Sequence, residues 1–338
     1  MGSCTCDICQ SPSSLIHDHM QGYLENTFFK IYHCENCNTS FSMPRSDASD
    51  IYESIYRNGQ DVPGYSRYWR YFHTIKEKSD PMRFLADSEE AYWGVITALK
   101  MLVTEKKEKK VLEIGSGLGY LTYALHKDGY HIKGMDLSTE AVKQARQKFG
   151  DFYMDENLFD HAKTHSEEYD IVILTEVIEH VDDPVEFLRA IKKLLTKNGK
   201  IIATTPNRSI APSSVAYDTE SPPVHHWWLS EESMINIGNT LNLQVDFIDY
   251  SDFYKRFPMS YNIGKQRRKL RKPILNSSGE LLRKSKSSNS KIVKKITKGL
   301  APIWAPFIKI YLNSKSLFNP EIVILRKRGE ILCAIFEK

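Results

Sequence analysis

The chain has 338 residues, of which 41% are hydrophobic and 26% charged, with a formal net charge of +4 at pH 7. This length and apolar content allow a sizeable core in one enlarged domain or two smaller ones. No run of about eighteen apolar residues occurs, which argues against a membrane-spanning helix, and the first ten residues lack the apolar centre of a signal peptide. The sequence therefore predicts a globular protein of the cytoplasm.

The small net charge hides an uneven distribution. Residues 255–328 contain 20 Lys and Arg and two acidic residues, whereas the rest of the chain contains 26 basic and 40 acidic residues. Such a basic segment either contacts an anionic partner or forms a solvated loop.

Cysteines gather at the N-terminus. Five of the six fall in the first 37 residues: Cys4, Cys6, Cys9, Cys34 and Cys37. The last four form two C-x-x-C pairs separated by 24 residues, and two such turns present four thiolates as tetrahedral zinc requires. In a reducing compartment this crowding favours metal over disulfides. Residues 1–45 resemble a zinc ribbon holding a structural zinc ion, in which Cys4 or His33 could replace one ligand.

Residues 46–104 are rich in tyrosine and tryptophan. Apolar residues at helical spacing near the end of this segment predict a helix: Tyr92, Val95, Ile96, Leu99 and Leu102. We expect an aromatic helical linker or lid, in which Tyr56 or Tyr65 are candidates for contact with a cofactor and the other tyrosines pack.

From Lys109 onward, short apolar segments alternate with amphipathic ones. The predicted strands are 110–115, 131–138, 169–177, 200–207, 244–251 and 330–338, and the predicted helices are 120–129, 138–149, 183–199 and 230–243. Ser138 and Ser230 are the expected N-caps of two of these helices. Strands that alternate with helices predict an α/β fold with a mostly parallel sheet covered on both faces.

Three glycines follow the first of these strands: Gly115, Gly117 and Gly119. Ligands of doubly wound sheets bind beyond the carboxyl ends of the strands, where this turn lies. A P-loop is excluded because no Lys-Ser/Thr pair follows, and a dinucleotide fingerprint would need glycine where Tyr120 stands. Glu113, two residues before the first glycine, would repel a pyrophosphate and suit a ligand with an amino group and a sulfonium.

The stretch VLEIGSGLGYLT, residues 111–122, resembles motif I of class I S-adenosylmethionine-dependent methyltransferases. The resemblance implies a Rossmann-like doubly wound sheet of seven strands in the order 3-2-1-4-5-7-6, with the seventh strand antiparallel. It places the core at 105–252 and the last strand within 321–338, so that 253–320 is a basic insertion. A pairing of such a core with an N-terminal ribbon resembles bacterial sugar and surface-polysaccharide methyltransferases.

The resemblance also implies which residues bind S-adenosylmethionine. Asp136, at the end of the second strand, would hold both ribose hydroxyls. Met154 would lie against the adenine ring and Asp155 near its exocyclic amine. The complete expected set is Glu113, Gly115, Gly117, Gly119, Asp136, Leu137, Met154, Asp155 and Thr175.

The segment TEVIEHVDDP, residues 175–184, follows the fourth strand at the same edge. Glu176, Glu179 and His180 have i, i+3 and i+4 spacing, so one helical turn would put them on one face. This arrangement is similar to that of ubiquinone-pathway O-methyltransferases and small-RNA 3′-end methyltransferases, in which it binds a divalent cation. Three roles stay open: a cation site, with Mg²⁺ needing waters and a further histidine; a general base or substrate-positioning group; and a structural turn.

Two histidines, His225 and His226, precede Trp227 and Trp228 in the loop after the fifth strand. An alcohol needs a base for methyl transfer, and neutral imidazole is the usual choice near pH 7. Either histidine is therefore a candidate catalytic base. The alternative is an aromatic lid cluster in which the histidines are only hydrogen-bonded.

The basic segment 255–320 allows three interpretations. Apolar residues at helical steps between 292 and 307, with Trp304 among lysines, favour contact with a membrane surface or a lipid-linked substrate. Its charge also fits nucleic acid, and its Ser- and Lys-rich part fits a plain loop. We expect an O-methyltransferase of a small hydroxylated acceptor, such as a sugar, a surface glycan or a lipid-linked intermediate, that is cytoplasmic or peripheral to the membrane. The alternatives are an RNA methyltransferase and a non-catalytic scaffold.

Overall fold

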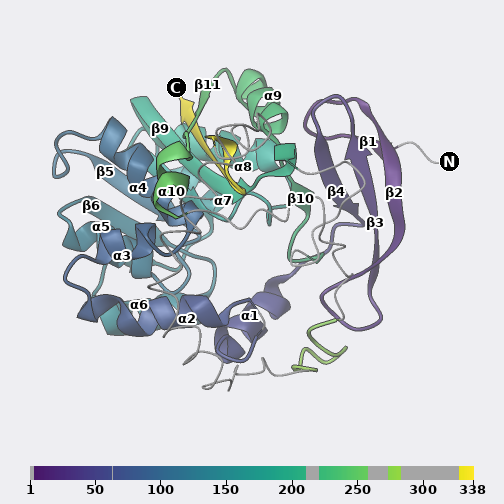
Figure 1. Ribbon diagram of the computed structural model, residues 1–338, viewed down its shortest axis with the longest axis horizontal. Coiled ribbons are helices and arrows are strands. Elements are labelled where there is room, and N and C mark those ends of the chain that lie inside the picture. Colours follow the sequence, from purple (N-terminus) through teal and green to yellow (C-terminus); the bar gives the residue numbers. More distant parts are fainter. Residues whose placement is uncertain (1–3, 63, 211–220, 258–272, 283–326) are drawn as a thin grey trace.

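The computed structural model describes the whole chain except residues 1–3, 63, 211–220, 258–272 and 283–326. The described residues form two sheets, a five-stranded one near the N-terminus and a seven-stranded one in the rest of the chain. Figure 1 shows the smaller sheet standing beside the larger one, with α1 (Ser49–Asn58) below the space between them.

The smaller sheet is antiparallel and has the order β1-β2-β3-β4-β10. Its strands are β1 (Cys4–Thr5), β2 (Pro12–Gln21), β3 (Phe28–Cys34), β4 (Thr39–Met43) and β10 (Trp227–Trp228). Cys6 and Cys9 lie on the turn after β1, whereas Cys34 ends β3 and Cys37 lies on the turn that follows it, as a zinc ribbon requires. The fifth strand comes from far along the sequence, so the ribbon is not a separate unit.

The larger sheet has the order β11-β12-β9-β8-β5-β6-β7. Its strands are β5 (Lys110–Ile114), β6 (His131–Met135), β7 (Tyr153–Met154), β8 (Tyr169–Thr175), β9 (Leu195–Pro206), β11 (Gln244–Phe247) and β12 (Ile331–Glu337). Strand β12 is antiparallel to both neighbours, and the pairs among β5 to β9 are parallel. Numbered within the core, this is the predicted order 3-2-1-4-5-7-6, and the predicted Rossmann-like α/β fold is confirmed.

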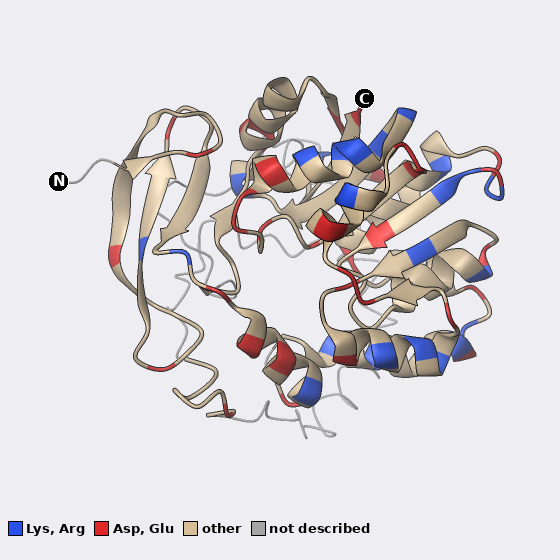
Figure 2. Ribbon diagram, turned by 180° about the vertical axis from the view of Figure 1, so that it is seen from behind, with Lys and Arg blue, Asp and Glu red and all other residues tan. Residues whose placement is uncertain are grey.

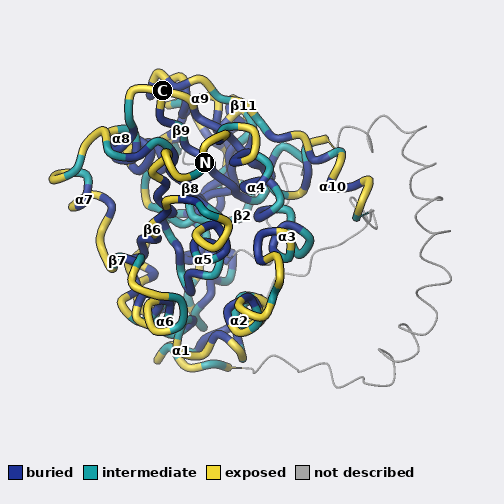
Figure 3. The backbone as a smooth tube through the Cα atoms, turned by 90° about the vertical axis from the view of Figure 1, so that its left-hand side faces the viewer, coloured by how far each residue is buried: buried dark blue, intermediate teal, exposed yellow. Residues whose placement is uncertain are grey.

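Helices cover both faces of the larger sheet. They are α3 (Pro81–Ala86), α4 (Glu90–Leu102), α5 (Tyr120–Lys127), α6 (Thr139–Phe149), α7 (Leu158–Thr164), α8 (Pro184–Leu194), α9 (Glu231–Leu241) and α10 (Ser251–Arg256). Along β5, Val111 packs with α4 and α5, whereas Leu112 packs with α8 and α9. Both are almost completely buried, so apolar residues on both faces specify a sheet enclosed by two helical layers. Figure 3 shows the buried strands between helices whose outer sides are exposed.

The aromatic segment before the core divides into two parts. The sequence predicts a linker or lid for 46–104, and α1 and α2 (Ser66–Thr74) do lie over the carboxyl edge of the sheet, followed by the 3₁₀ turn η1 (Ile75–Glu77). Helix α4 does not lie over that edge, because its buried residues pack in the core against one face of the larger sheet. The last part of this segment is therefore a layer of the core.

Two caps fix where the helices beside the site begin. Ser138 accepts a hydrogen bond from the Ala141 amide at the start of α6, and Ser230 forms a reciprocal capping box with Ser233 at the start of α9. Both N-caps agree with the sequence prediction. A short 3₁₀ turn, η2 (Arg208–Ile210), follows β9.

Only part of the basic segment is described. Residues 273–282 lie against the ribbon and α1: the Ile274 amide donates to the Tyr23 carbonyl at 2.9 Å, and the Ser54 hydroxyl donates to the Gly279 carbonyl at 2.7 Å. The amphipathic stretch 292–307, with Trp304, lies outside the described residues. In the part of the chain that the structure describes, no helix has the length and apolarity needed to cross a bilayer.

Candidate active site

A cavity of about 840 Å³ lies at the carboxyl edge of the larger sheet. Its floor is the ends of β5, β6 and β8, and its walls come from α1, α2 and residues 224–226. Figure 2 shows acidic positions on α1 and on loops at the neighbouring edge of the sheet. The described lining contains ten Asp and Glu residues, and among its described residues Arg67 is the single Lys or Arg. The cavity therefore has a negative electrostatic character.

The glycine turn forms part of the cavity floor, and its backbone demands glycine. Gly115, Gly117 and Gly119 have φ values of +73°, +50° and +76°, a region that residues with a Cβ rarely adopt. A Cβ on Gly115 would lie 2.4 Å from the Val177 side chain, and one on Gly119 would lie 2.5 Å from Tyr153. The turn therefore brings backbone close to whatever occupies the cavity.

Asp136 lies beside this turn at the end of β6. One carboxylate oxygen accepts the Gly117 amide at 2.7 Å, and the other accepts the Ser138 amide at 2.9 Å. A carboxylate offers about four acceptor positions, so each oxygen keeps capacity for one more donor. Burial raises the pKa of Asp136, and the two amides oppose that rise. The geometry suits a vicinal diol.

Glu113 lies buried under the glycine turn, where the Thr122 hydroxyl donates to it. Burial raises the pKa of Glu113 to about 8, and the negative charge of Asp136 adds to the rise. A cationic ligand in the cavity would stabilise the ionised forms of both Glu113 and Asp136. This arrangement agrees with the sequence argument against a pyrophosphate.

The remaining residues expected to bind the cofactor divide into two groups. Leu137 and Thr175 line the cavity. Met154 and Asp155 are not among its lining residues, and Asp155 forms an ion pair with Arg146 at 3.3 Å. At this end of the cavity the lining is formed instead by the next residues along the chain, 156–159.

Tyrosines from α1 and α2 form the roof of the cavity. The lining includes Tyr52, Tyr56, Tyr65 and Tyr68, among which the sequence singles out Tyr56 and Tyr65. The Tyr56 hydroxyl lies 3.1 Å from the position of a Cβ added to Gly117, so its side chain contacts the glycine turn. Burial raises the pKa of Tyr56 well above its usual range. These side chains are therefore neutral hydroxyls on aromatic rings.

The segment after β8 is a turn and not the predicted helical turn. Glu176 has a φ of +56°, and the His180 amide donates to the Val177 carbonyl at 2.9 Å. A left-handed residue at the strand end reverses the chain at once, so no helical face forms. Glu176 still lines the cavity, but it is not part of the group that Glu179 and His180 form.

That group consists of Glu179, His180 and His225, whose ligand atoms lie within 4.8 Å of one another. The two imidazole rings pack edge to face with centroids 4.3 Å apart. Nδ1 of His180 bonds the Val224 carbonyl, which can only accept, so this nitrogen carries the proton. Nε2 therefore presents its lone pair 3.8 Å from a Glu179 carboxylate oxygen.

Burial keeps both histidines of this group neutral. It lowers the pKa of His180 to about 4, an effect that the bond to Val224 partly opposes, and it lowers the pKa of His225 well below its usual range. Neutral imidazole with a lone pair facing a cavity can accept a proton or bind a cation. The group thus combines the features of a base and of a metal site.

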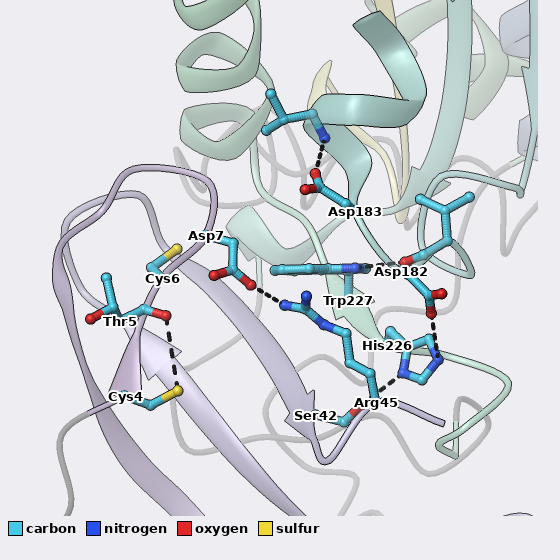
Figure 4. A network of polar contacts seen from close by, with 12 residues as sticks. Cys4, Thr5, Cys6, Asp7, Ser42, Arg45, Asp182, Asp183, His226 and Trp227 are labelled. Atoms are coloured by element: carbon cyan, nitrogen blue, oxygen red, sulfur yellow. Dashed lines mark hydrogen bonds and ion pairs between the residues drawn. The ribbon is translucent and has the colours of Figure 1, made fainter. Parts of the chain in front are cut away.

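His226 points the other way, toward the ribbon. Its Nδ1 lies 3.2 Å from the Ser42 hydroxyl, and its Nε2 lies 3.8 Å from Asp182. Figure 4 shows this contact beside the side chains of Arg45 and Trp227. The structure therefore separates the two neighbouring histidines that the sequence leaves equivalent: His225 joins the cavity group and His226 is held by the ribbon.

The ribbon cysteines form a compact cluster. Cys6 and Cys37 have sulfurs 3.6 Å apart, Cys9 and Cys34 have sulfurs 3.4 Å apart, and all four sulfurs lie within 4.8 Å. Zinc with four thiolates at about 2.3 Å places the sulfurs about 3.8 Å apart, so the cluster fits that ion. The hydrogen bond from Cys37 lowers the pKa of Cys6 to about 6.

The two substitute ligands that the sequence allows lie outside this cluster. The Cys4 thiol is directed to the carbonyl of Thr5, and the imidazole of His33 bonds Ser40 at 2.9 Å. The four cysteines of the two C-x-x-C pairs are therefore the ligand set that the structure supports.

Known proteins are similar to part of this chain. Residues 91–246 match the family model described as a methyltransferase domain. A ubiquinone biosynthesis O-methyltransferase of Yersinia pestis (strain Pestoides F) is 34% identical over 107 residues, which are 30% of this chain and 44% of the relative. The same protein of Yersinia pseudotuberculosis serotype O:1b gives the same values. The chain thus spans less than half the length of the curated relatives it matches.

Similar solved structures were also found. A methyltransferase dependent on S-adenosylmethionine from Archaeoglobus fulgidus has a TM-score of 0.44 at 16% identity, covering 72% of this chain and 93% of that one. Another from Mesorhizobium loti has a TM-score of 0.44 at 14% identity, covering 75% of this chain and all of that one, 100%.

Proposed function

We propose that this chain, whose residues 91–246 match a methyltransferase-domain family model, transfers the methyl group of S-adenosylmethionine to an oxygen of a small hydroxylated acceptor. The observation that carries the proposal is Asp136, whose two oxygens are each held by one backbone amide beside a glycine turn. This arrangement leaves acceptor capacity for the ribose diol of the cofactor. Glu113 and Asp136 together favour a ligand that bears positive charge.

The protein would contribute mainly position and a base. Methyl transfer is an in-line displacement at the sulfonium, so both partners must be aligned and water excluded. The proton of the acceptor hydroxyl would pass to Nε2 of His180, because the bond from Nδ1 to Val224 fixes the tautomer that has its lone pair on Nε2. His225 is the second candidate base, and Glu176 would assist in positioning the acceptor.

A divalent cation at this group is the alternative to a histidine base, because an imidazole nitrogen that binds the ion cannot also accept the proton. In the neutral His180, Nε2 and the Glu179 oxygen 3.8 Å away are both acceptors, and a cation or a hydroxyl hydrogen between them would relieve their repulsion. Glu179, His180 and His225 would hold the ion, which would supply a Lewis acid to the acceptor oxygen. Two imidazoles and one carboxylate suit Mn²⁺, Fe²⁺ or Zn²⁺ better than Mg²⁺.

The charge of the cavity supports a neutral acceptor. Ten acidic residues line it, and Arg67, the single Lys or Arg in its described lining, is paired with Glu89 at 2.9 Å. A phosphate would meet this field unfavourably unless a cation accompanied it. Hydroxyl-bearing aromatic rings suit a sugar, a glycan or a lipid-linked intermediate, and RNA is the less favoured alternative.

We also propose a structural zinc ion on Cys6, Cys9, Cys34 and Cys37. Buried thiolates at these separations would be strongly repulsive without a cation, and their closed arrangement leaves no position for a substrate. Contact of the segment 255–320 with the inner membrane surface stays a proposal, which flotation of the chain with anionic vesicles would test against a variant lacking 283–320.

The proposed function is tested by calorimetry and a transfer screen. Wild-type protein should bind S-adenosylmethionine and methylate at least one member of a panel of neutral glycosides, phenols and isoprenoid-linked sugars, detected by transfer of labelled methyl. His225→Ala should bind the cofactor but transfer much less. Absence of cofactor binding by the wild type would refute the enzyme assignment, and transfer to RNA but to no neutral acceptor would refute the acceptor class.

A further inference from the structure

The segment that carries His225 and His226 lies between the two sheets. On one side, the amides of His226 and Trp227 both donate to the Glu179 carbonyl, at 2.9 and 3.1 Å. On the other side, the Ser42 amide of β4 donates to the His226 carbonyl at 2.9 Å, and Trp227 and Trp228 pair with Phe41 and Ser40. The segment therefore has backbone hydrogen bonds both to the ribbon and to the turn after β8.

The far end of the same segment is bonded to a cysteine turn. The Cys37 carbonyl accepts the Ser230 hydroxyl at 2.7 Å and lies 3.2 Å from the Ser233 hydroxyl. The Thr39 hydroxyl lies 2.6 Å from the Ser233 hydroxyl and 3.0 Å from the Cys37 sulfur. Because Ser230 and Ser233 form the capping box of α9, the turn that carries a proposed zinc ligand is joined to the first residues of that helix.

Packing reinforces these polar contacts. The cysteines of the ribbon and Phe41 belong to the same buried cluster as Trp227 and Leu229. The Arg45 guanidinium stacks on the Trp227 ring at 4.4 Å and pairs with Asp7, which lies between Cys6 and Cys9. Figure 4 shows the two sides of this contact, with the cysteine turn on one side and His226 on the other.

We propose that the zinc ribbon serves as the positioning element of the active-site histidine segment, residues 224–230, and not as an independent binding module. The metal fixes the two cysteine turns, β4 presents Ser42 to His226, and Cys37 anchors the start of α9. His225 then stands against His180 because the residues on either side of it are held from both sheets. Ser42, which contacts His226, and Thr39, which contacts Ser233 in the capping box of α9, are positioning residues.

The arrangement also explains why the ribbon has no free edge at β4. An exposed edge strand offers unpaired amides and carbonyls to other chains, and here β10 covers that edge. A ribbon that recruited a partner by strand addition at β4 would have to release Trp227 and Trp228, both of which are buried.

Hydrogen exchange of the full chain tests the inference without reference to activity. Removal of zinc by a chelator should raise the exchange rates of the amides of His226 and Trp227 by about tenfold or more. Amides of β5 and β8 should keep their protection, and S-adenosylhomocysteine should bind within about twofold of its original Kd. Unchanged exchange at 226–227 would overturn the inference, as would equal loss of protection in β5 and β8, which would make the ribbon a general folding support.

Matched variants give a second test in the metal-loaded protein. Thr39→Val keeps the shape of the side chain but removes its hydroxyl, and should increase exchange at 226–227 while leaving bound zinc and cofactor affinity unchanged. Thr39→Ser should restore the protection. Lys30→Ala, which removes an exposed ribbon ion pair with Asp18, should change none of these quantities. If Lys30→Ala and Thr39→Val change the exchange at 226–227 equally, Thr39 does not have the proposed positioning role.

The catalytic consequence rests on the proposed function, and it can fail separately. If His225 or His180 is the base, Thr39→Val should lower kcat by about tenfold with little change in the KM for S-adenosylmethionine. Altered exchange together with unaltered kcat would keep the positioning of the segment and refute the catalytic role of its histidines. Unaltered exchange would refute the positioning itself.

Discussion

Replacement of Asp136 by asparagine tests the cofactor site most directly. In the free protein its two oxygens accept the amides of Gly117 and Ser138, at 2.7 and 2.9 Å. The carboxylate has about four acceptor positions, so two remain for the two ribose hydroxyls. The asparagine side chain has a single oxygen with two acceptor positions. These two positions cannot accept hydrogen bonds from both a backbone amide and the ribose diol, as the carboxylate can.

The magnitude follows from the hydrogen bonds lost. A hydrogen bond to a charged group contributes about 1.5–3 kcal/mol, and asparagine loses at least one such bond to the ribose. At about 1.4 kcal/mol for each factor of ten, Asp136→Asn should weaken binding about 10- to 150-fold. Asp136→Ala loses both bonds and should weaken it about 10²- to 10⁴-fold.

Calorimetric titration with S-adenosylhomocysteine measures these constants without turnover. Asp155→Asn is the matched control, because the same change is made in the same region but at a side chain that pairs with Arg146 outside the cavity lining. It should change the Kd by less than about threefold. If Asp136→Asn binds as well as the wild type, or if Asp155→Asn is equally impaired, the assignment of the diol to Asp136 is wrong.

Three further predictions concern the charges, the base and the metal. Burial raises the pKa of Glu113 to about 8, and a cationic ligand favours the ionised carboxylate, so the affinity for S-adenosylmethionine should rise with pH through about 8. Glu113→Gln should abolish that rise. If the affinity of the wild type does not change with pH, this role of Glu113 is wrong. His225→Ala should lower kcat by about 10²- to 10⁴-fold with an unchanged cofactor Kd. Leu282→Ala, at an exposed site, is the control and should not lower kcat. If the two variants have equal kcat values, His225 is excluded as the catalytic base. Cys9→Ser should lose bound zinc, measured by emission spectrometry, whereas Cys4→Ser should retain it.

The sequence was sufficient for the core because the relevant signals are local. Strands such as β5 and β8 are short apolar runs, and the helices between them have apolar faces. The resemblance implied the sheet order, whereas β7, which has only two residues, was not among the predicted strands. Gly115 and Asp136 lie directly at strand ends, where the topology alone brings them to one edge.

The turn after β8 shows where local spacing is insufficient. Glu176, Glu179 and His180 have the spacing of a helical face, and the same spacing occurs in a turn. The turn forms because Glu176 has a left-handed backbone at the point where β8 ends against β9. There the Glu176 amide donates to the Thr204 carbonyl at 3.1 Å. That contact joins residues 28 positions apart, which no pattern within ten residues reveals.

The predicted cofactor residues after β7, Met154 and Asp155, lie outside the cavity lining. Asp155 pairs with Arg146 of α6, which also donates to the Tyr153 carbonyl at 2.8 Å. This arginine draws Asp155 away from the cavity, so the lining begins at Glu156. The register of a short loop depends on such a side-chain pair, and an acidic residue at either position gives the same sequence pattern. The signal that could have placed Asp155 outside the cavity lining is Arg146 itself, one helical turn before the end of α6.

The pair Trp227 and Trp228 shows why the histidines could not be distinguished beforehand. The sequence allowed a lid cluster, but both rings are buried and form the fifth strand of the ribbon sheet. In a strand, neighbouring side chains point to opposite sides, so pairing of β10 with β4 also orients the residues just before it. His226 then meets Ser42 and His225 is left toward His180. The pairing of Trp227 with Phe41 and of Trp228 with Ser40, between residues about 190 positions apart, thus decides which of the two neighbouring histidines faces His180.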